Sequence, residues 1–334
     1  MRILLLGGTA FLSHATATEA VRRGHEVTCL ARGSAPAPEG VRFERGDRDE
    51  ADGLAPVREQ RWDAVVDVSR QPGQVRRAVA ELDTPHWVFV STANVYALPE
   101  EGSAGAAPTE TDPLLEPLEA DAMSTMEEYG PAKVACEQAV TSQMARQGGT
   151  ATLVRAGLIG GPGDTSGRVG YWPSRFAHPS GPDVLVPDDP DFPVAFVDVR
   201  DLAAWLVEAA EQRLDGAFNA TGPVVPLAEL LEAAREVAGA QVPARPVPPA
   251  RLAALGVHPW MGPRSLPLWI DDPALRSFAA LDTARARAAG LQTRPVEETL
   301  RDTLAWEETR ETPRAAGLRD DEEQEIREAL DARA

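Results

Sequence analysis

The chain opens with Met1-Arg2-Ile3-Leu4-Leu5-Leu6-Gly7-Gly8-Thr9-Ala10-Phe11-Leu12-Ser13, an apolar stretch that two glycines end. Residues 2–6 have the pattern of a buried strand, and residues 10–23 that of a helix. In such a strand–turn–helix, small residues let the backbone approach a pyrophosphate, which lies on the free N–H groups of the helix N-terminus. The glycine spacing is only partly met, since Ala10 and Ser13 stand at two of its positions. The turn predicts a dinucleotide site made of Gly7, Thr9, Ala10, Phe11 and Leu12.

The rest of the first half repeats the alternation of strand and helix. Further strands are predicted at 26–30, 41–44, 64–68, 87–91 and 151–156, and helical segments at 50–60, 71–82 and 127–147. Short strands that are apolar on both faces and alternate with helices indicate a parallel sheet covered on both sides. Right-handed crossovers then make an α/β fold with a doubly wound parallel sheet of the Rossmann type.

The second half has a looser pattern and predicts a smaller lobe. A strand at 194–197, a helix at 200–212 and a strand at 217–220 still suit the sheet, whereas Pro-rich turns separate short helices from residue 223 onward. The final 30 residues look helical and acidic. We therefore expect a dinucleotide-binding domain at 1–163 to which 194–222 returns, and a mixed, largely helical C-terminal substrate lobe at 164–193 and 223–334.

Composition limits the partners. The 334 residues carry 52 acids against 33 bases, a formal net charge of −19. A field of that sign repels phosphate backbones and anionic membranes, so we expect neither nucleic acid nor a membrane as partner. No apolar run approaches the roughly 20 residues that cross a bilayer, and the apolar start is too short for a signal peptide. These features predict a cytoplasmic protein.

Cysteine and histidine give no sign of a metal site. The two cysteines, Cys29 and Cys136, fall within a predicted strand and a predicted helix, and the five histidines lack metal-ligand spacing. We expect the cysteines to be small buried hydrophobic residues and predict no bound metal.

One lysine stands out among the basic residues. Of the 33, only Lys133 is not arginine, and it follows Tyr129, one of three tyrosines, by four residues. That spacing puts both side chains on one face of a helix. A phenol with a pKa near 10 is a poor proton carrier at neutral pH, and a nearby ammonium lowers that pKa. The pair predicts an acid–base tyrosine tuned by Lys133.

Hydroxyl groups follow at the end of the strand predicted at 87–91. Ser91 and Thr92 stand at the carboxyl end of a central strand, where doubly wound sheets bind ligands. Thr92 is predicted to donate to a substrate oxygen beside Tyr129, whereas capping of the strand end is an equal alternative for Ser91.

Other residues predict how a dinucleotide is selected. Asp47, in Gly46-Asp47-Arg48-Asp49, follows the third strand and is predicted to accept a hydrogen bond from an adenine amino group. The second strand ends without the acid that usually binds the ribose hydroxyls of NAD, and Arg32 stands there instead. This arrangement favours NADP over NAD.

Together these motifs resemble the extended short-chain dehydrogenase/reductase superfamily, and within it the NAD-dependent epimerase/dehydratase family. The matching segments are 7–13, Asp47, 91–96, Tyr129 with Lys133, 155–164, 196–201 and 218–220. The turn at 7–11 is similar to that of actinobacterial reductase-like members. The resemblance implies an NAD(P)-dependent oxidoreductase that transfers hydride at a carbonyl or carbinol of a small or nucleotide-linked metabolite.

The resemblance also assigns residue roles. It implies Thr92 as the hydroxyl group, Tyr129 as the acid–base group and Lys133 as the group that tunes the tyrosine and binds the nicotinamide ribose. It adds Arg48, Ser91 and Ala156 to the cofactor site, with Ala156 in place of a proline common in the family, and Ala93 and Asn94 to the substrate site. The helix at 127–147 is expected to form a homodimer interface, as in relatives.

The smaller lobe offers substrate candidates of its own. Tyr171 and Trp172 are predicted as stacking rings and Arg175 as an anion clamp, with Trp260 and Trp269 as further lining. Ordinary hydrophobic packing is the alternative for these rings. Reduction, epimerisation and dehydration all remain open. A catalytically silent NAD(P)-sensing regulator and an RNA-associated protein are the rival functions, the second disfavoured by charge.

Overall fold

The central sheet is built around the strand that opens the chain. In the computed structural model, which describes residues 1–7, 9–97, 107–272, 275–276 and 280–332, β1 (Arg2–Leu6) pairs in parallel with β2 (Glu26–Ala31) and β4 (Ala64–Asp67). The other strands are β3 (Arg42–Arg45), β5 (His86–Thr92), β6 (Thr150–Ala156) and β11 (Gly216–Ala220). Their order is β11-β6-β5-β4-β1-β2-β3, with every pair parallel. The doubly wound sheet is confirmed.

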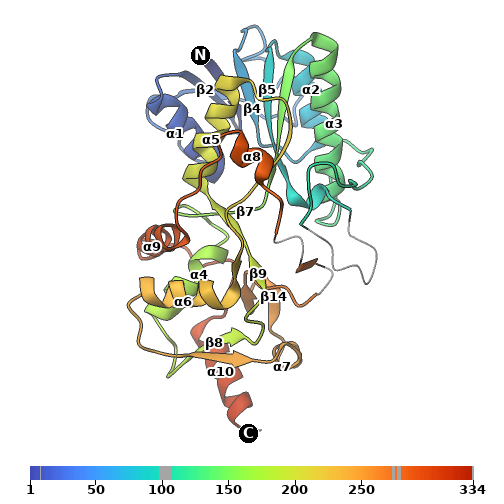
Figure 1. Ribbon diagram of the computed structural model, residues 1–334. Helices are drawn as coiled ribbons and strands as arrows, with labels where there is room; N and C mark the ends of the chain where they lie inside the picture. Colours follow the sequence, from blue (N-terminus) through green and yellow to red (C-terminus); the bar gives the residue numbers. More distant parts are fainter. Residues whose placement is uncertain (8, 98–106, 273–274, 277–279, 333–334) are drawn as a thin grey trace.

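Helices cover both faces of this sheet (Figure 1). On one face α1 (Phe11–Arg22) packs against α5 (Val199–Gln212), and on the other α2 (Pro72–Glu81) packs against α3 (Tyr129–Gln147). Each pair closes its own apolar core against strands that are buried on both sides. Cys29 and Cys136 lie in these two cores as expected, and burial raises the pKa of each thiol to about 12.

The helix expected at 50–60 does not form. The segment is a series of turns held by i→i+3 bonds, among them Ala55 N to Asp52 O at 2.8 Å and Val57 N to Leu54 O at 2.9 Å. Gly53 explains the difference, because a Cβ there would collide with the backbone of Asp47. The close contact fixes a tight path in which an α-helix has no room.

The second lobe lies at the other end of the molecule and is mostly helical (Figure 1). Its helices are α4 (Arg168–Ala177), α6 (Leu227–Val237), α7 (Pro249–Ala254), α9 (Val296–Glu307) and α10 (Asp320–Asp331). Pairs of short strands complete it: β8 (Val184–Pro187) with β13 (Ala244–Val247), β9 (Pro193–Val194) with β12 (Val225–Pro226), and β14 (His258–Trp260) with β15 (Ser265–Pro267). Residues 308–319 are not helical, so the expectation of a continuous helical C-terminus is wrong between α9 and α10.

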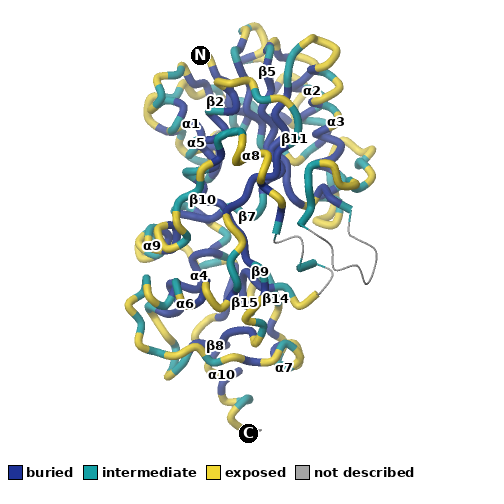
Figure 2. Tube along the Cα trace, in the orientation of Figure 1, coloured by how far each residue is buried: buried dark blue, intermediate teal, exposed yellow. Residues whose placement is uncertain are grey.

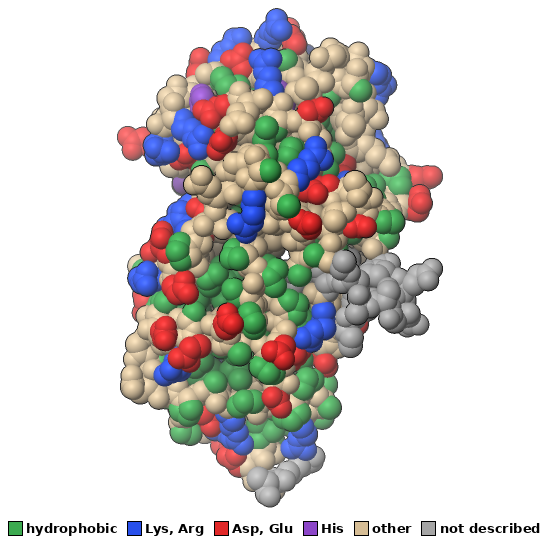
Figure 3. Space-filling model, in the orientation of Figure 1, with side chains coloured by type: hydrophobic (Ala, Val, Ile, Leu, Met, Phe, Trp, Pro, Cys, Tyr) green, Lys and Arg blue, Asp and Glu red, His purple; other side chains and the backbone are tan. Residues whose placement is uncertain are grey.

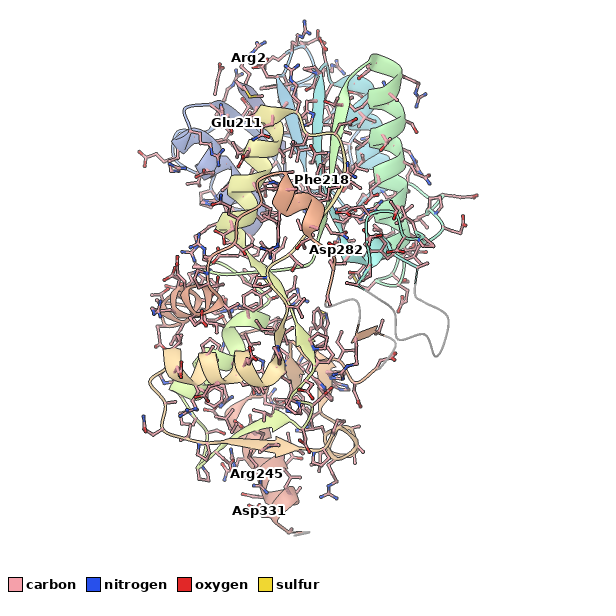
Figure 4. The ribbon with its side chains drawn as sticks, in the orientation of Figure 1. Arg2, Glu211, Phe218, Arg245, Asp282 and Asp331 are labelled. Carbon is pink, nitrogen blue, oxygen red and sulfur yellow. The ribbon has the colours of Figure 1, made fainter. Side chains whose placement is uncertain are left out.

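The lobes meet at two short paired strands, and a later segment of the chain returns from the helical lobe to the sheet. β7 (Leu158–Gly160) pairs in parallel with β10 (Phe196–Asp198), and Figure 2 shows this junction as largely buried. The segment after residue 280 returns to the sheet: α8 (Ala284–Ala288) packs against β11, and Ala286 lies in the core of the sheet lobe. Figure 4 labels Phe218 and Asp282 at this contact, where Asn219 Nδ2 donates to the Asp282 carbonyl at 3.1 Å. The exact division of the chain into domains stays a prediction.

Charges are mixed on the face that Figure 3 displays. Basic and acidic side chains are interspersed there, and apolar side chains gather over the helical lobe. No helix in the part of the chain that the structure describes is long and apolar enough to span a membrane. Among the same residues, no group of His, Cys, Asp or Glu has the arrangement of a metal site.

Candidate active site

The site begins at the turn between β1 and α1. Gly7 has φ +94°, a conformation that side chains disfavour, and its N–H donates to the Leu30 carbonyl at 2.9 Å. Ser13 Oγ braces the turn by donating to the carbonyls of Gly7 and Ala10 at 2.6 and 2.8 Å. Gly8 lies outside the described residues. The small residue at position 13 is therefore a hydrogen-bonding support as well as a packing element.

The N-terminus of α1 is open for an anion. No side chain caps it, and its first turn holds no acidic residue. A helix start without a cap presents free N–H groups and the positive end of the helix dipole. These features suit the pyrophosphate of a dinucleotide.

Most of the residues predicted for catalysis and for the cofactor meet at one cavity of about 310 Å³ beside this helix. The cavity is lined by Gly7, Ala10, Phe11, Leu12, Ser13, Val68, Val90, Ser91, Thr92, Tyr129, Lys133, Ala156, Gly157 and Ile159. It lies at the carboxyl ends of β1, β4, β5 and β6, where a doubly wound sheet binds ligands. Thr9 is buried within the turn instead, and its N–H donates to the Gly7 carbonyl at 2.9 Å.

The sequence argument missed several members of this lining. Val68 directly follows β4, and Val90 lies two residues before the end of β5. Their place near the carboxyl edge of the sheet was the available signal. Gly157 follows β6, and a Cβ there would lie 2.7 Å from Thr221 Oγ1. This contact across the loops explains a glycine at that point.

Lys133 lies under the cavity, buried within the sheet lobe. Its Nζ donates to the carbonyls of Val90 at 2.6 Å and Ser69 at 2.7 Å, and it lies 4.7 Å from the centre of the Phe89 ring. Burial lowers the pKa of Lys133 to about 8, and the nearby acid Asp67 opposes that shift. The ammonium is thus held in place by backbone oxygens at the ends of β4 and β5.

Tyr129 begins α3 and faces the same cavity. Burial raises the pKa of its phenol, although a hydrogen bond with Thr92 and the charges of Arg70 and Arg168 act in the opposite direction. The net shift is opposite to the lowering expected from Lys133. Desolvation of the phenol outweighs the neighbouring charges in this structure, and the Lys133 ammonium is engaged by two carbonyls.

Local packing places Tyr129 and Thr92 close together. A Cβ on Gly130 would collide with the carbonyl of Asn94, so the start of α3 lies directly on the short 3-10 helix Ala93–Val95. Thr92 Oγ1 accepts the Asn94 N–H at 3.3 Å and donates to Asn94 Oδ1 at 3.1 Å. Ala93 is buried and Asn94 is exposed beyond the cavity lining.

Ser91 has the feature expected of a ligand-binding hydroxyl. Its Oγ is buried and has no hydrogen-bond partner within the described residues. Buried polar atoms are nearly always paired, so an orphan that faces a cavity favours a ligand partner. This atom, the uncapped helix and the glycine turn together fit a nicotinamide dinucleotide.

The structure places Arg48 in an internal ion pair. Its guanidinium donates to both carboxylate oxygens of Asp67, at 2.7 and 2.9 Å, and to the Gln74 carbonyl at 3.0 Å. Asp67 has no exposed surface. The prediction that Arg48 contacts the cofactor overlooked this partner, because the acid lies 19 residues away and reaches it only in the folded chain.

Arg32 and Asp47 keep the positions predicted for them. Arg32 is exposed just beyond the end of β2, and Asp47 follows β3 with one carboxylate oxygen accepting the Asp49 N–H at 3.1 Å. Neither lines the cavity of 310 Å³. Their roles toward the adenosine half stay predictions.

The substrate role given to Tyr171, Trp172 and Arg175 is contradicted by their burial. Both rings are fully enclosed in the core of the helical lobe, and Trp172 Nε1 donates to the Pro267 carbonyl at 3.0 Å. Arg175 pairs with Asp320 at 2.7 Å and Glu323 at 3.2 Å. Packing encloses the two rings and ion pairs engage the Arg175 guanidinium, whereas Tyr171 Oη and Arg175 Nε have no hydrogen-bond partner among the described residues. Trp269 is also buried, whereas Trp260 is partly exposed.

The fold is that of an enzyme of the extended short-chain dehydrogenase/reductase type, with a Rossmann sheet and a cavity at the carboxyl ends of its central strands. Residues 74–220 match the model of the NAD dependent epimerase/dehydratase family. The match bears out the resemblance to this family that the sequence motifs indicated. No curated protein matches the chain in sequence.

Solved structures with the same fold include several sugar-nucleotide epimerases. UDP-glucose 4-epimerase from Thermotoga maritima, solved with UDP-glucose, is 18% identical with a TM-score of 0.67, over 92% of this chain and 99% of that one. The Thermus thermophilus UDP-glucose 4-epimerase, in complex with NAD, is 21% identical with a TM-score of 0.63 over 92% and 98%. The UDP-glucuronic acid 4-epimerase from Bacillus cereus, also with NAD, is 13% identical with a TM-score of 0.67 over 92% and 99%. At these identities the likeness concerns the fold.

Proposed function

We propose that this enzyme binds a nicotinamide dinucleotide at the α1 turn and transfers hydride at a carbonyl or carbinol, with Tyr129 as its proton carrier. The observation that carries the proposal is the convergence of Thr92, Tyr129 and Lys133 on the cavity that the uncapped start of α1 also borders. A small-molecule substrate, free or linked to a nucleotide, occupies the outer part of that cavity.

The bound nicotinamide supplies the hydride acceptor or donor. Thr92 Oγ1 orients the substrate oxygen, and Tyr129 Oη removes its proton or returns one as the carbon is oxidised or reduced. Lys133 Nζ would hold the nicotinamide ribose through its hydroxyls and would supply the positive charge that stabilises the Tyr129 phenolate. Ser91 Oγ gains the hydrogen bond that it otherwise lacks.

These residues serve two reaction outcomes equally well. If the cofactor is restored within one turnover, the net reaction is epimerisation or dehydration, in keeping with the epimerases that share the fold. If it leaves oxidised, the enzyme is a reductase. Turnover of free cofactor during the reaction separates the two.

We further propose that Arg32 selects NADP. It is exposed at the end of β2, the position from which a cation reaches a 2′-phosphate, and no acid stands there for a ribose diol. The solved relatives reported with a cofactor hold NAD, so the choice needs a direct measurement.

A second copy of the chain is the proposed partner. The groove between α2 and α3 has a volume of about 540 Å³ and is lined by both helices, including Val79, Ala135 and Ala139. Sedimentation velocity tests for a dimer, and Ala139→Glu would dissociate it by placing a charge in the interface.

Calorimetry with NAD(H) and NADP(H) tests the proposal directly. We expect micromolar NADP(H) binding that Arg32→Asp weakens at least ten-fold, with Arg45→Asp as the control on the neighbouring strand. Tight NAD binding that is unaffected by Arg32→Asp would contradict the selection of NADP. It would favour an epimerase or dehydratase over a reductase. The absence of binding by either dinucleotide would overturn the proposed function.

A further inference from the structure

Arg168 is a cation without a carboxylate partner at the start of α4. Its Nε lies 3.3 Å from Ser166 Oγ, and its guanidinium lies over the Trp260 ring at 5.1 Å from the ring centre. No carboxylate lies within 4.0 Å of it among the described residues. Burial lowers its pKa, whereas each other described arginine with a shifted pKa has it raised by acidic partners.

The acid nearest in sequence is already in use. Asp164 accepts the Ser166 N–H at 2.8 Å with one oxygen and the Ser166 hydroxyl at 3.0 Å with the other. It therefore closes its own turn and forms no ion pair with Arg168. Arg175 lies about two turns further along α4. It differs from Arg168 because ion pairs with Asp320 and Glu323 neutralise its guanidinium.

Arg168 belongs to the surroundings of the reacting group. Val169, the next residue of α4, lies directly on Gly160, where a Cβ would be 2.5 Å from Val169 Cγ2, and Ile159 beside Gly160 lines the cavity. Arg70 follows Ser69, whose carbonyl accepts from Lys133 Nζ at 2.7 Å, and it has no ion pair within the described residues. The charges of both arginines act on the pKa of Tyr129. One cation thus comes from the helical lobe and the other from the sheet lobe. In a chain with a net charge of −19, this makes a local positive field next to the phenol.

We propose that the substrate carries an oxyanion, a carboxylate or a phosphate ester, on or next to the reacting carbon, and that Arg168 binds it with Arg70 as the second cation. The inference rests on the proposed function, because it concerns the substrate of the same site. A partly desolvated guanidinium, held flat by an aromatic ring, is suited to two parallel hydrogen bonds to such a group. The bound oxyanion supplies the missing counter-charge.

The test uses simple probes with the protein saturated with its nicotinamide dinucleotide. Glycolate and its neutral analogue ethylene glycol are compared by ligand-observed NMR, and inorganic phosphate by ³¹P line broadening. We expect glycolate or phosphate to bind saturably, ethylene glycol not to bind, and Arg168→Gln to weaken the anion about ten-fold or more. Arg168→Lys should regain part of the affinity, and Arg301→Gln, an exposed cation on α9, should change nothing.

The outcomes separate this inference from the proposed function. Preference for glycolate identifies a carboxylate, and preference for phosphate identifies a phosphate ester. If the dinucleotide binds but neither anion does, or if Arg168→Gln leaves anion binding unchanged, the anion site is overturned alone. The anion titrations are repeated on the protein without dinucleotide. If anions bind there through Arg168 while calorimetry detects no binding of either dinucleotide, the proposed function fails instead. Dinucleotide affinity in each variant reports whether the fold is intact.

Discussion

Polar groups at the cavity of the sheet lobe are arranged differently from the buried carboxylate Glu323 in the helical lobe. In the described part of the sheet lobe, no side-chain hydrogen bond caps the start of α1 and Ser91 Oγ has no partner. Lys133 Nζ donates to two backbone carbonyls and forms no ion pair there. In the helical lobe, fully buried Glu323 accepts from Ser180 Oγ at 2.6 Å and Leu185 N at 3.1 Å, and it pairs with Arg175. The first arrangement leaves donors for a ligand, and the second satisfies the protein's own groups.

This difference teaches where function and stability are located. The C-terminal helix α10 contacts the rest of the helical lobe through ion pairs, among them the largely buried pair of Arg327 with Asp183 at 2.9 Å and the exposed pair of Arg245 with Asp331 at 2.7 Å. Figure 4 shows the last pair at the far end of that lobe. A buried charge that loses its partner is costly, whereas an open donor at a binding site is satisfied by the ligand. Changes in the two lobes should therefore be felt in different measurements.

The largest expected effect comes from removing the proton carrier. Tyr129→Phe should lower kcat by about 10²–10⁴-fold, the usual range for loss of a general acid–base group, with dinucleotide affinity nearly unchanged. Tyr96→Phe is the matched control, since its hydroxyl bonds Asn219 and Arg155 in the protein interior. The control should lose about 1 kcal/mol of stability and keep its chemistry. An equal loss of kcat in both variants would contradict the role of Tyr129 as the proton carrier.

The next effect concerns the helical lobe. Arg175 and Arg327 both pair with the buried carboxylate of Glu323. Glu323→Ala removes this shared partner and should lower the free energy of unfolding by about 3–5 kcal/mol. Glu325→Ala removes an exposed partner of Arg264 and should cost about 0–1 kcal/mol. Urea unfolding measures both. Dinucleotide affinity of the folded variants should stay the same, and a parallel fall would break the separation between the lobes.

A smaller effect should appear in the pH dependence of cofactor binding. Lys133 has a pKa of about 8, so its ammonium, and with it dinucleotide affinity, should decline as pH rises through that value. Asp67 opposes the lowering, and Asp67→Asn should therefore move the midpoint to lower pH. Titrating the dissociation constant between pH 6.5 and 9.5 checks this shift. Asp49→Asn, at an exposed carboxylate, should leave the midpoint in place, and a midpoint unmoved by Asp67→Asn would contradict the coupling.

The smallest effect separates an open donor from a structural one. Ser91→Ala removes a hydroxyl without a partner, so the stability of the free protein should change by less than about 0.5 kcal/mol while dinucleotide affinity falls several-fold. Ser13→Ala removes two hydrogen bonds and should cost about 1–2 kcal/mol of stability. If Ser91→Ala destabilised the free protein as much as Ser13→Ala, the view of Ser91 as a ligand donor would be wrong.

Much of the sheet lobe was predictable because its signals are local. Strand and helix alternation located the parallel sheet, and the single lysine four residues after Tyr129 located the centre of the cavity. Each of these patterns is decided by neighbours within a few residues. The helix predicted at 50–60 does not form, and the reason is a contact that is not local in this sense. Gly53 lies directly on the backbone of Asp47, and this contact accompanies a series of turns instead of a helix.

The sequence by itself determined the sheet and the glycine turn. It also determined the hydroxyl of Thr92 at the end of β5 and the pair of Tyr129 and Lys133 on α3. Periodicity and spacing within one segment of the chain encode each of these features. Only the tertiary structure decided the partners of charged groups. Arg48 went to Asp67 and Arg175 to Asp320 and Glu323, across 19, 145 and 148 residues of chain. Arg168 was left without a carboxylate. An ion pair depends on the distance between folded elements, and that distance has no signature in local sequence.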